Sequence, residues 1–371
     1  MSTPLLIGSC EPFSGKSAVV LGLARQLTRL GIEVMYGKPL ATLAAGPEAA
    51  VSDLPRDPIL PQDPDVPFIG SMLGLEVGQI LPSVHVMESE TAEQRLRTGD
   101  LSPGPGLAEL RQRVAEAGDR AVLLEAAGSL NEGLLYGLGL AQLAETLGAI
   151  VILVHHWTDS RSVDALLAAR HQLGERLVGV VLNGVPPEGV GELRRDLEPA
   201  LARLGIPVLG VMPRSPLLRS VTVEELGRRL QARVLCCRER LDLLVETLSI
   251  GAMNVNSAME FFRRRRNMAV VTGADRTDIQ LAALEASTQC LILTGAGMPL
   301  SQLLNRAEEL EVPVLKVEHD TLTTVEVIEA AIGHGRLHES VKATYAIRLV
   351  EEHCRLGPLF DQMGLSIRQG A

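Results

Sequence analysis

Three observations in the sequence predict an α/β fold in which a parallel sheet is flanked by helices. Short apolar runs alternate with segments of helical period through the first 211 residues, the order that builds a parallel sheet covered on both faces. The chain is 46% hydrophobic but only 2% aromatic, so we expect cores of Leu, Val, Ile and Ala. At 371 residues it is too long for one compact core, and two domains are expected.

The first half carries six apolar runs that we predict to be strands. They are residues 5–7, 33–36, 121–124, 150–154, 178–182 and 208–211. Residues 17–30 have apolar side chains at helical spacing and are expected to form a helix directly after the first strand. Residues 44–67 are rich in Pro, Asp and Gly, so a long loop is expected there.

A second, smaller alternating series follows Pro216. Strands are expected at 268–271, 290–293 and 312–316, helices at 278–285, 299–310 and 323–331, and a final amphipathic helix at 338–354. We therefore predict a larger α/β domain over residues 1–225 and a smaller α/β domain with the C-terminal helix over residues 226–371.

A phosphate-binding loop is predicted at Gly8–Ser17. A triphosphate requires backbone N–H donors at a helix N-terminus, a lysine for its outer phosphates and a hydroxyl that ligates Mg²⁺. Strand 5–7, the loop and the helix that follows supply all of these, with Lys16 as the catalytic lysine and Ser17 as the metal ligand. The other expected nucleotide contacts in the loop are Gly8, Ser9, Glu11, Ser14 and Gly15. The usual loop has a glycine where this chain has Cys10, so the match is imperfect, and a plain strand-loop-helix turn is the alternative.

Composition excludes several classes of partner. The net charge of −10 would repel a nucleic-acid backbone, so no nucleic-acid partner is expected. The five cysteines are scattered, which favours a reducing, cytoplasmic compartment over a disulfide framework. No apolar stretch approaches 18 residues, and no export signal precedes Pro4, so neither a membrane partner nor secretion is expected.

The loop and the following Lys38-Pro39 pair resemble the dethiobiotin synthetase branch of P-loop NTPase proteins. The resemblance implies that Lys38 faces the triphosphate as a second catalytic cation and that Thr42 occupies a nucleotide-contacting hydroxyl position. A solvated lysine at a strand end is the alternative for Lys38. The implied cofactors are ATP and Mg²⁺.

The same resemblance assigns polar residues near the ends of three further segments. Glu125 matches the acidic strand end that holds Mg²⁺, at the edge where parallel strands meet their ligands. Asp65, rather than Asp63, matches the second metal carboxylate, and Asn183 matches an adenine-binding asparagine. A turn in Asn-Gly-Val-Pro also explains Asn183. The adjacent His155 and His156 point apart on a strand and predict no metal site.

The second half resembles the DRTGG domain, through residues 252–254 and 267–280. Asp275-Arg276-Thr277 persists, but Asp278-Ile279 replaces the two name-giving glycines. A dethiobiotin synthetase-like domain followed by a DRTGG domain is the arrangement at the N-terminus of long phosphate acetyltransferases. The resemblance therefore indicates a phosphotransacetylase-like protein, and because the acetyltransferase domain does not follow, acetyl transfer is not expected.

Three functions are compatible with these residues. The first is a regulatory protein that binds ATP and ADP, hydrolyses ATP slowly if at all, and signals through the DRTGG-like domain to a protein partner or small effector. The second is an ATP-dependent carboxylate ligase of the dethiobiotin synthetase type. The third is a scaffold or assembly subunit with a vestigial P-loop. Because related folds pair across their nucleotide sites, a homo-oligomer is also expected.

Overall fold

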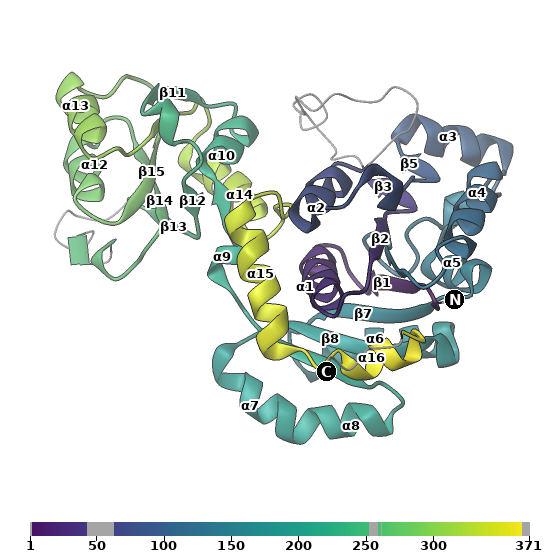
Figure 1. Ribbon diagram of the computed structural model, residues 1–371. Helices are drawn as coiled ribbons and strands as arrows, with labels where there is room; N and C mark the ends of the chain where they lie inside the picture. Colours follow the sequence, from purple (N-terminus) through teal and green to yellow (C-terminus); the bar gives the residue numbers. More distant parts are fainter. Residues whose placement is uncertain (1, 43–62, 252–258, 261, 366–371) are drawn as a thin grey trace. The chain divides into compact units, whose positions relative to one another are not determined.

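The chain forms two compact units, shown in Figure 1. The computed structural model describes residues 2–365 apart from 43–62, 252–258 and 261. The first unit comprises Met1–Arg214 and Leu337–Ala371, and the second comprises Ser215–Arg336. The second unit is thus inserted in the chain ahead of the C-terminal segment, which differs from the expected division at residue 225. Residues 44–62 of the expected long loop and the 252–254 motif lie outside the described residues.

Within the described residues, a parallel sheet of seven strands carries the first unit, in the order β4-β2-β6-β1-β7-β8-β9. Its strands are β1 (Leu5–Ser9), β2 (Val34–Gly37), β4 (Ile80–Leu81), β6 (Ala121–Glu125), β7 (Ile150–His156), β8 (Leu177–Val185) and β9 (Val208–Pro213). Leu5 pairs with Leu123 of β6 and with Ile150 of β7, so β1 lies at the centre. Every residue of β1 and β6 is buried, as expected for strands covered on both faces.

Helices cover both faces of this sheet. Those of the first unit are α1 (Lys16–Arg29), α2 (Asp65–Leu73), α3 (Ser89–Thr98), α4 (Pro105–Ala115), α5 (Leu140–Leu147), α6 (Val163–Leu173), α7 (Val190–Glu192), α8 (Glu198–Arg203), α15 (Ser340–His353) and α16 (Gly357–Gln362). Leu6 of β1 belongs to a core shared with Leu107 of α4 and Leu143 of α5. In Figure 1, α1 lies on the opposite side of β1 from α5. The predicted layered α/β fold is confirmed.

The second unit is a smaller α/β fold around a sheet in the order β11-β16-β15-β14-β13. Its strands are β11 (Arg233–Cys236), β13 (Thr247–Ile250), β14 (Met268–Gly273), β15 (Thr288–Thr294) and β16 (Val314–Lys316), with a separate pair β10 (Val221–Thr222) and β12 (Leu244–Val245). Its helices are α9 (Pro216–Arg219), α10 (Val223–Arg229), α12 (Thr277–Leu284), α13 (Ser301–Glu309) and α14 (Thr321–Ala331). Strand β11 runs antiparallel to β16, and the other described pairs of this sheet are parallel.

The start of α2 corrects the expected loop. Asp65 and Pro67 belong to the first turn of this helix. Proline is tolerated there because the first N–H groups of a helix have no intrahelical acceptor. The Asp63 side chain supplies one acceptor, since Asp65 N donates to Asp63 Oδ1 at 2.9 Å. A small parallel pair of strands consists of β3 (Leu40–Thr42), which precedes α2 in the chain, and β5 (His85–Met87), which follows it. These strands were too short to be predicted.

Helix α15, near the C-terminus, packs along α1, the helix that follows the predicted phosphate loop. Gly22 of α1 permits this approach, because a β-carbon there would overlap Val350 of α15. Arg29 and Glu351 form an ion pair between the same two helices. Among the helices in the described part of the chain, none combines the length and apolar character needed to span a bilayer.

Candidate functional site

The loop between β1 and α1 ends at Gly15, whose backbone conformation few other residues adopt. Gly15 is the N-cap of α1 with a φ of 99°. A β-carbon at this position would also overlap Nδ2 of Asn183. Asn183 Nδ2 donates to the Ser14 carbonyl at 2.7 Å, which fixes the loop to β8. The N-terminus of α1, where backbone N–H groups lack intrahelical acceptors, therefore lies beside the carboxyl end of β1.

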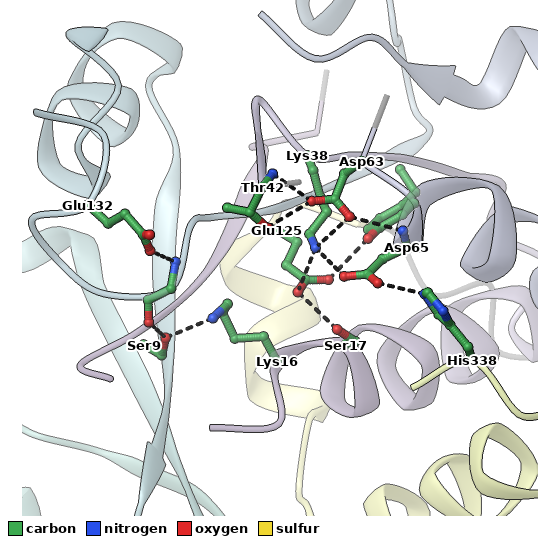
Figure 2. A network of polar contacts seen from close by, with 12 residues as sticks. Ser9, Lys16, Ser17, Lys38, Thr42, Asp63, Asp65, Glu125, Glu132 and His338 are labelled. Carbon is green, nitrogen blue, oxygen red and sulfur yellow. Dashed lines mark hydrogen bonds and ion pairs between the residues drawn. The ribbon is translucent and has the colours of Figure 1, made fainter. Parts of the chain in front are cut away.

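Lys16 begins α1 and is only 8% exposed. Its Nζ donates to Ser9 Oγ at 2.9 Å, and Ser9 Oγ donates to the Gly128 carbonyl at 2.8 Å (Figure 2). Burial lowers the pKa of Lys16, and the nearby Glu125 opposes this effect only in part. A buried ammonium of this kind is stabilised by an anion placed beside it.

Half-buried Ser17 and the buried Glu125 and Tyr36 form a chain of hydrogen bonds. Ser17 Oγ donates to Glu125 Oε1 and Tyr36 OH donates to Glu125 Oε2, both at 3.0 Å. Glu125 is 2% exposed, at the end of β6. Burial and the Glu125 carboxylate raise the pKa of Tyr36 well above its ordinary value, so the phenol remains a donor. Both oxygens of Glu125 are thereby oriented.

These oxygens fit a magnesium ion. Mg²⁺ prefers hard oxygen ligands in an octahedron, where adjacent ligands lie about 3.0 Å apart for metal–oxygen distances of about 2.1 Å. The separation of 3.0 Å between Ser17 Oγ and Glu125 Oε1 matches that spacing. A serine hydroxyl and a carboxylate could thus hold Mg²⁺ at the N-terminus of α1.

Lys38 lies among three carboxyl groups. Its Nζ is 3.2 Å from Asp63 Oδ1 and 3.7 Å from Glu125 Oε1, and it donates to Asp65 Oδ2. The Lys38 side chain is 7% exposed. Burial lowers its pKa, but the attraction of the three acids is larger in sum, and the net pKa is raised above the ordinary value. Lys38 therefore stays charged, and the excess of acidic groups suits a divalent cation.

Asp63 is fully buried and connects Thr42 to this cluster. Thr42 donates to Asp63 Oδ2 through its backbone N at 2.8 Å and its Oγ1 at 3.0 Å. The hydroxyl expected to contact nucleotide thus also positions the carboxylate beside Lys38.

Asp65 receives a contact from the far end of the chain. His338 Nε2 lies 2.8 Å from Asp65 Oδ1, and the His338 ring lies 5.4 Å from the ring of Phe68, centroid to centroid. Phe68 and Asp65 are both on α2. Figure 2 shows His338 on the side of Asp65 away from Lys38.

Glu11 holds the phosphate loop to the end of β7. Its Oε2 is 3.2 Å from His155 Nδ1, and its Oε1 accepts from the backbone N of His156. Burial raises the pKa of Glu11, but these hydrogen bonds and the electrostatic attraction of His155 and His156 together outweigh burial, and the net pKa is lowered. Cys10 lies near this pair, and burial with the Glu11 charge raises the pKa of its thiol to about 12.

Comparison with known protein families identifies the first unit. Residues 3–222 match the AAA domain family, which is more than half of the chain. The chain belongs to the AAA domain family. Residues 225–331 match the DRTGG domain, so the AAA domain precedes a DRTGG domain as the sequence resemblance implied.

Two curated relatives of this AAA domain protein differ in their named activities. The phosphate acetyltransferase of Nitratidesulfovibrio vulgaris is 24% identical over 373 residues, covering 95% of this chain and 50% of that protein. The hydrogenobyrinate a,c-diamide synthase of Brucella suis biovar 1 is 31% identical over 209 residues, covering 55% of this chain and 39% of that protein. This chain spans about half, or less, of the length of these relatives.

One solved structure shares the DRTGG domain. It contains the CBS and DRTGG domains of the regulatory region of Clostridium perfringens pyrophosphatase, complexed with the activator diadenosine tetraphosphate. The sequence identity is 24% and the TM-score is 0.26, over 29% of this chain and 46% of that chain.

The structure gathers the residues that the sequence singled out in this AAA domain. Ser17, Lys38, Asp65 and Glu125 lie in one network with Thr42, and Lys16 bonds to Ser9 beside that network. Gly15, Ser14 and Asn183 form the adjoining turn. Glu11 points to β7 instead. Gly8 serves packing, because a β-carbon there would overlap Leu140. Their roles toward nucleotide and metal remain predictions.

Four polar residues of the AAA domain site were not predicted. Tyr36 lies two residues before Lys38, and the two-residue period of a strand could have placed both beside Glu125. Asp63 was weighed against Asp65, and both contact Lys38. Glu132, which accepts from the backbone N of Gly128, and His338 carry no local signal in the sequence.

Proposed function

We propose that this chain binds Mg-ATP at the N-terminus of α1 and works as a nucleotide-dependent regulatory protein. The observation that carries the proposal is the convergence of Lys16, Ser17 and Glu125 behind a glycine-ended turn. Lys16 would neutralise the outer phosphates, and the helix N-terminus would face the inner ones. The Ser14 hydroxyl supports this, because it is buried and has no hydrogen-bond partner among the described residues.

Ser17, Glu125 and Asp65 would hold the Mg²⁺ that accompanies the nucleotide. When bound, this ion neutralises phosphate charge and orients the outer phosphate. Tyr36 keeps Glu125 oriented, and Lys38 supplies a second positive charge beside the acidic groups. These groups hold the triphosphate in one position and place cations around it, which is compatible with slow hydrolysis to ADP.

The regulatory part of the proposal rests on domain content. An AAA domain and a DRTGG domain occupy separate compact units of one chain. We propose that ATP and ADP favour different states of the first unit and that the second unit transmits them to a protein partner or small effector. A homo-oligomer and a cytoplasmic location belong to the same proposal. Acetyl transfer is the named activity of relatives that are about twice as long, and we do not propose it for these residues.

A second candidate is an ATP-dependent carboxylate ligase, favoured by the position of Lys38. This lysine is buried, charged and adjacent to the proposed metal ligands, where it could stabilise an acyl phosphate as charge develops on it. The similarity to hydrogenobyrinate a,c-diamide synthase supports the same candidate.

Phosphate release measured with and without acceptors separates the two candidates. The regulator predicts slow release from Mg-ATP that carboxylates, diamines and amide donors leave unchanged. The ligase predicts stimulation by one carboxylate and amine pair, and loss of that stimulation in Lys38→Ala. Identical limited-proteolysis patterns with ATP and with ADP would count against the regulator.

A further inference from the structure

His338 is the feature of the site that the proposed function does not use. Its Nε2 lies 2.8 Å from Asp65 Oδ1, and a carboxylate accepts hydrogen bonds only, so this nitrogen carries the proton and donates. The other oxygen of Asp65 accepts from Lys38. Asp65 is therefore held from both sides, by a cation of the site and by a residue more than 270 positions away in sequence.

The place of His338 in the chain gives this contact its significance. The second unit ends at Arg336, and the chain re-enters the first unit at Leu337, one residue before His338. Helix α15 begins at Ser340 and packs along α1, whose N-terminus carries Lys16 and Ser17. The segment that returns from the second unit thus reaches a proposed metal ligand before it reaches its own helix.

The packing of α15 does not depend on His338. Val350 lies against Gly22, and Glu351 pairs with Arg29, more than two turns farther along the helix. The His338 side chain is 39% exposed, whereas that of Asp65 is 13% exposed. Removing the imidazole therefore takes little from the core but removes one hydrogen bond to Asp65 Oδ1.

We propose that His338 is a positioning residue for Asp65, through which the first-unit segment that follows the second unit in the chain sets the Mg²⁺ affinity of the nucleotide site. This inference rests on the proposed Mg-nucleotide function. Groups that orient a metal ligand commonly change metal affinity by about 10- to 100-fold when they are removed. With His338 in place, Asp65 presents a fixed carboxylate. Without it, the Asp65 carboxylate loses one of the contacts that orient it, and the site holds Mg²⁺ less tightly.

The test compares His338→Ala, His338→Gln and His171→Ala with wild type. Glutamine can donate to Asp65 from about the position of Nε2, and His171 is an exposed histidine on α6 of the same unit. The Mg²⁺ concentration that gives half-maximal binding of a fluorescent ATP analogue is measured for each protein, along with the thermal midpoint. We expect His338→Ala to raise that concentration about tenfold, with ATP affinity at saturating Mg²⁺ and the thermal midpoint close to wild type. We expect His338→Gln to recover most of the loss.

Hydrogen exchange tests the connection to the second unit. Mg-ATP is expected to change amide protection in residues 321–337 of wild type, and this change is expected to be absent from His338→Ala at saturating Mg-ATP. Equal Mg²⁺ dependence in wild type and His338→Ala, or equal protection changes, would overturn the inference while leaving nucleotide binding intact. No binding of the analogue by wild type would instead refute the proposed function.

Discussion

Gly22 of α1 lies against Val350 of α15 with no space for a side chain between them. Helix α15 therefore packs directly on the helix that begins with Lys16 and Ser17. We expect Gly22→Val to lower the free energy of unfolding by about 1–3 kcal/mol, because overpacking displaces neighbouring atoms. Urea unfolding measures the change. Because the two side chains are in contact, the loss in the double variant Gly22→Val with Val350→Ala should be smaller than the sum of the two single losses, and additive losses would argue against this packing.

Tyr36→Phe tests how Glu125 is oriented. The substitution removes the hydroxyl that donates to Glu125 Oε2 and leaves that buried oxygen without this partner. We expect an unfolding free energy lower by about 1–3 kcal/mol and a Mg²⁺ requirement for ATP binding about tenfold higher. Calorimetry at several Mg²⁺ concentrations measures the second effect. An unchanged Mg²⁺ requirement would show that Tyr36 serves stability alone.

Glu11 gives the fold a pH dependence whose sign is set by its lowered pKa. Folding holds this pKa below the ordinary value of 4.5, so ionised Glu11 stabilises the fold above about pH 4.5. That contribution is lost as the pH falls through the folded-state pKa. We expect the difference in unfolding free energy between wild type and Glu11→Gln to be constant from about pH 6 to about pH 5. We expect that difference to shrink as the pH falls further. A difference that does not change with pH would contradict this role.

Asn183→Ala separates two roles of one amide. Its Nδ2 donates to the Ser14 carbonyl and its Oδ1 accepts from Gly184 N, which leaves one N–H and one lone pair for a base. Loss of the hydrogen bond to Ser14 should weaken the binding of ATP and of GTP alike. Loss of the base contact should remove any preference for ATP over GTP. Competition binding with both nucleotides measures the ratio. An unchanged ratio would refute adenine recognition by Asn183.

The sequence predicted the layers of the fold because burial leaves a local trace. Strands such as Ala121–Glu125, covered on both faces, appear as unbroken apolar runs, and the Gly-Lys-Ser turn marks the start of α1. Periodicity also predicted helix α15. It did not predict that α15 packs on the first unit, because an apolar stripe fits any complementary surface.

The site was predictable to the extent that its residues lie next to strand ends. Lys38 and Glu125 follow that rule. His338 does not, since only the return of the chain from the second unit brings it to Asp65. Thr42 was expected near nucleotide, and nothing in the local sequence indicated that it would bind Asp63 across residues 43–62.

The most direct test of the central claim is calorimetric titration of the full chain with Mg-ATP, beside Lys16→Ala. We expect wild type to bind with micromolar affinity, equivalent to about 8 kcal/mol. Lys16→Ala should lose about 2 kcal/mol or more of this, because a charged hydrogen bond to phosphate is removed. A melting curve of Lys16→Ala without nucleotide serves as the folding control. Absence of binding by wild type, or equal binding by a folded Lys16→Ala, would contradict the assignment of the nucleotide to this loop.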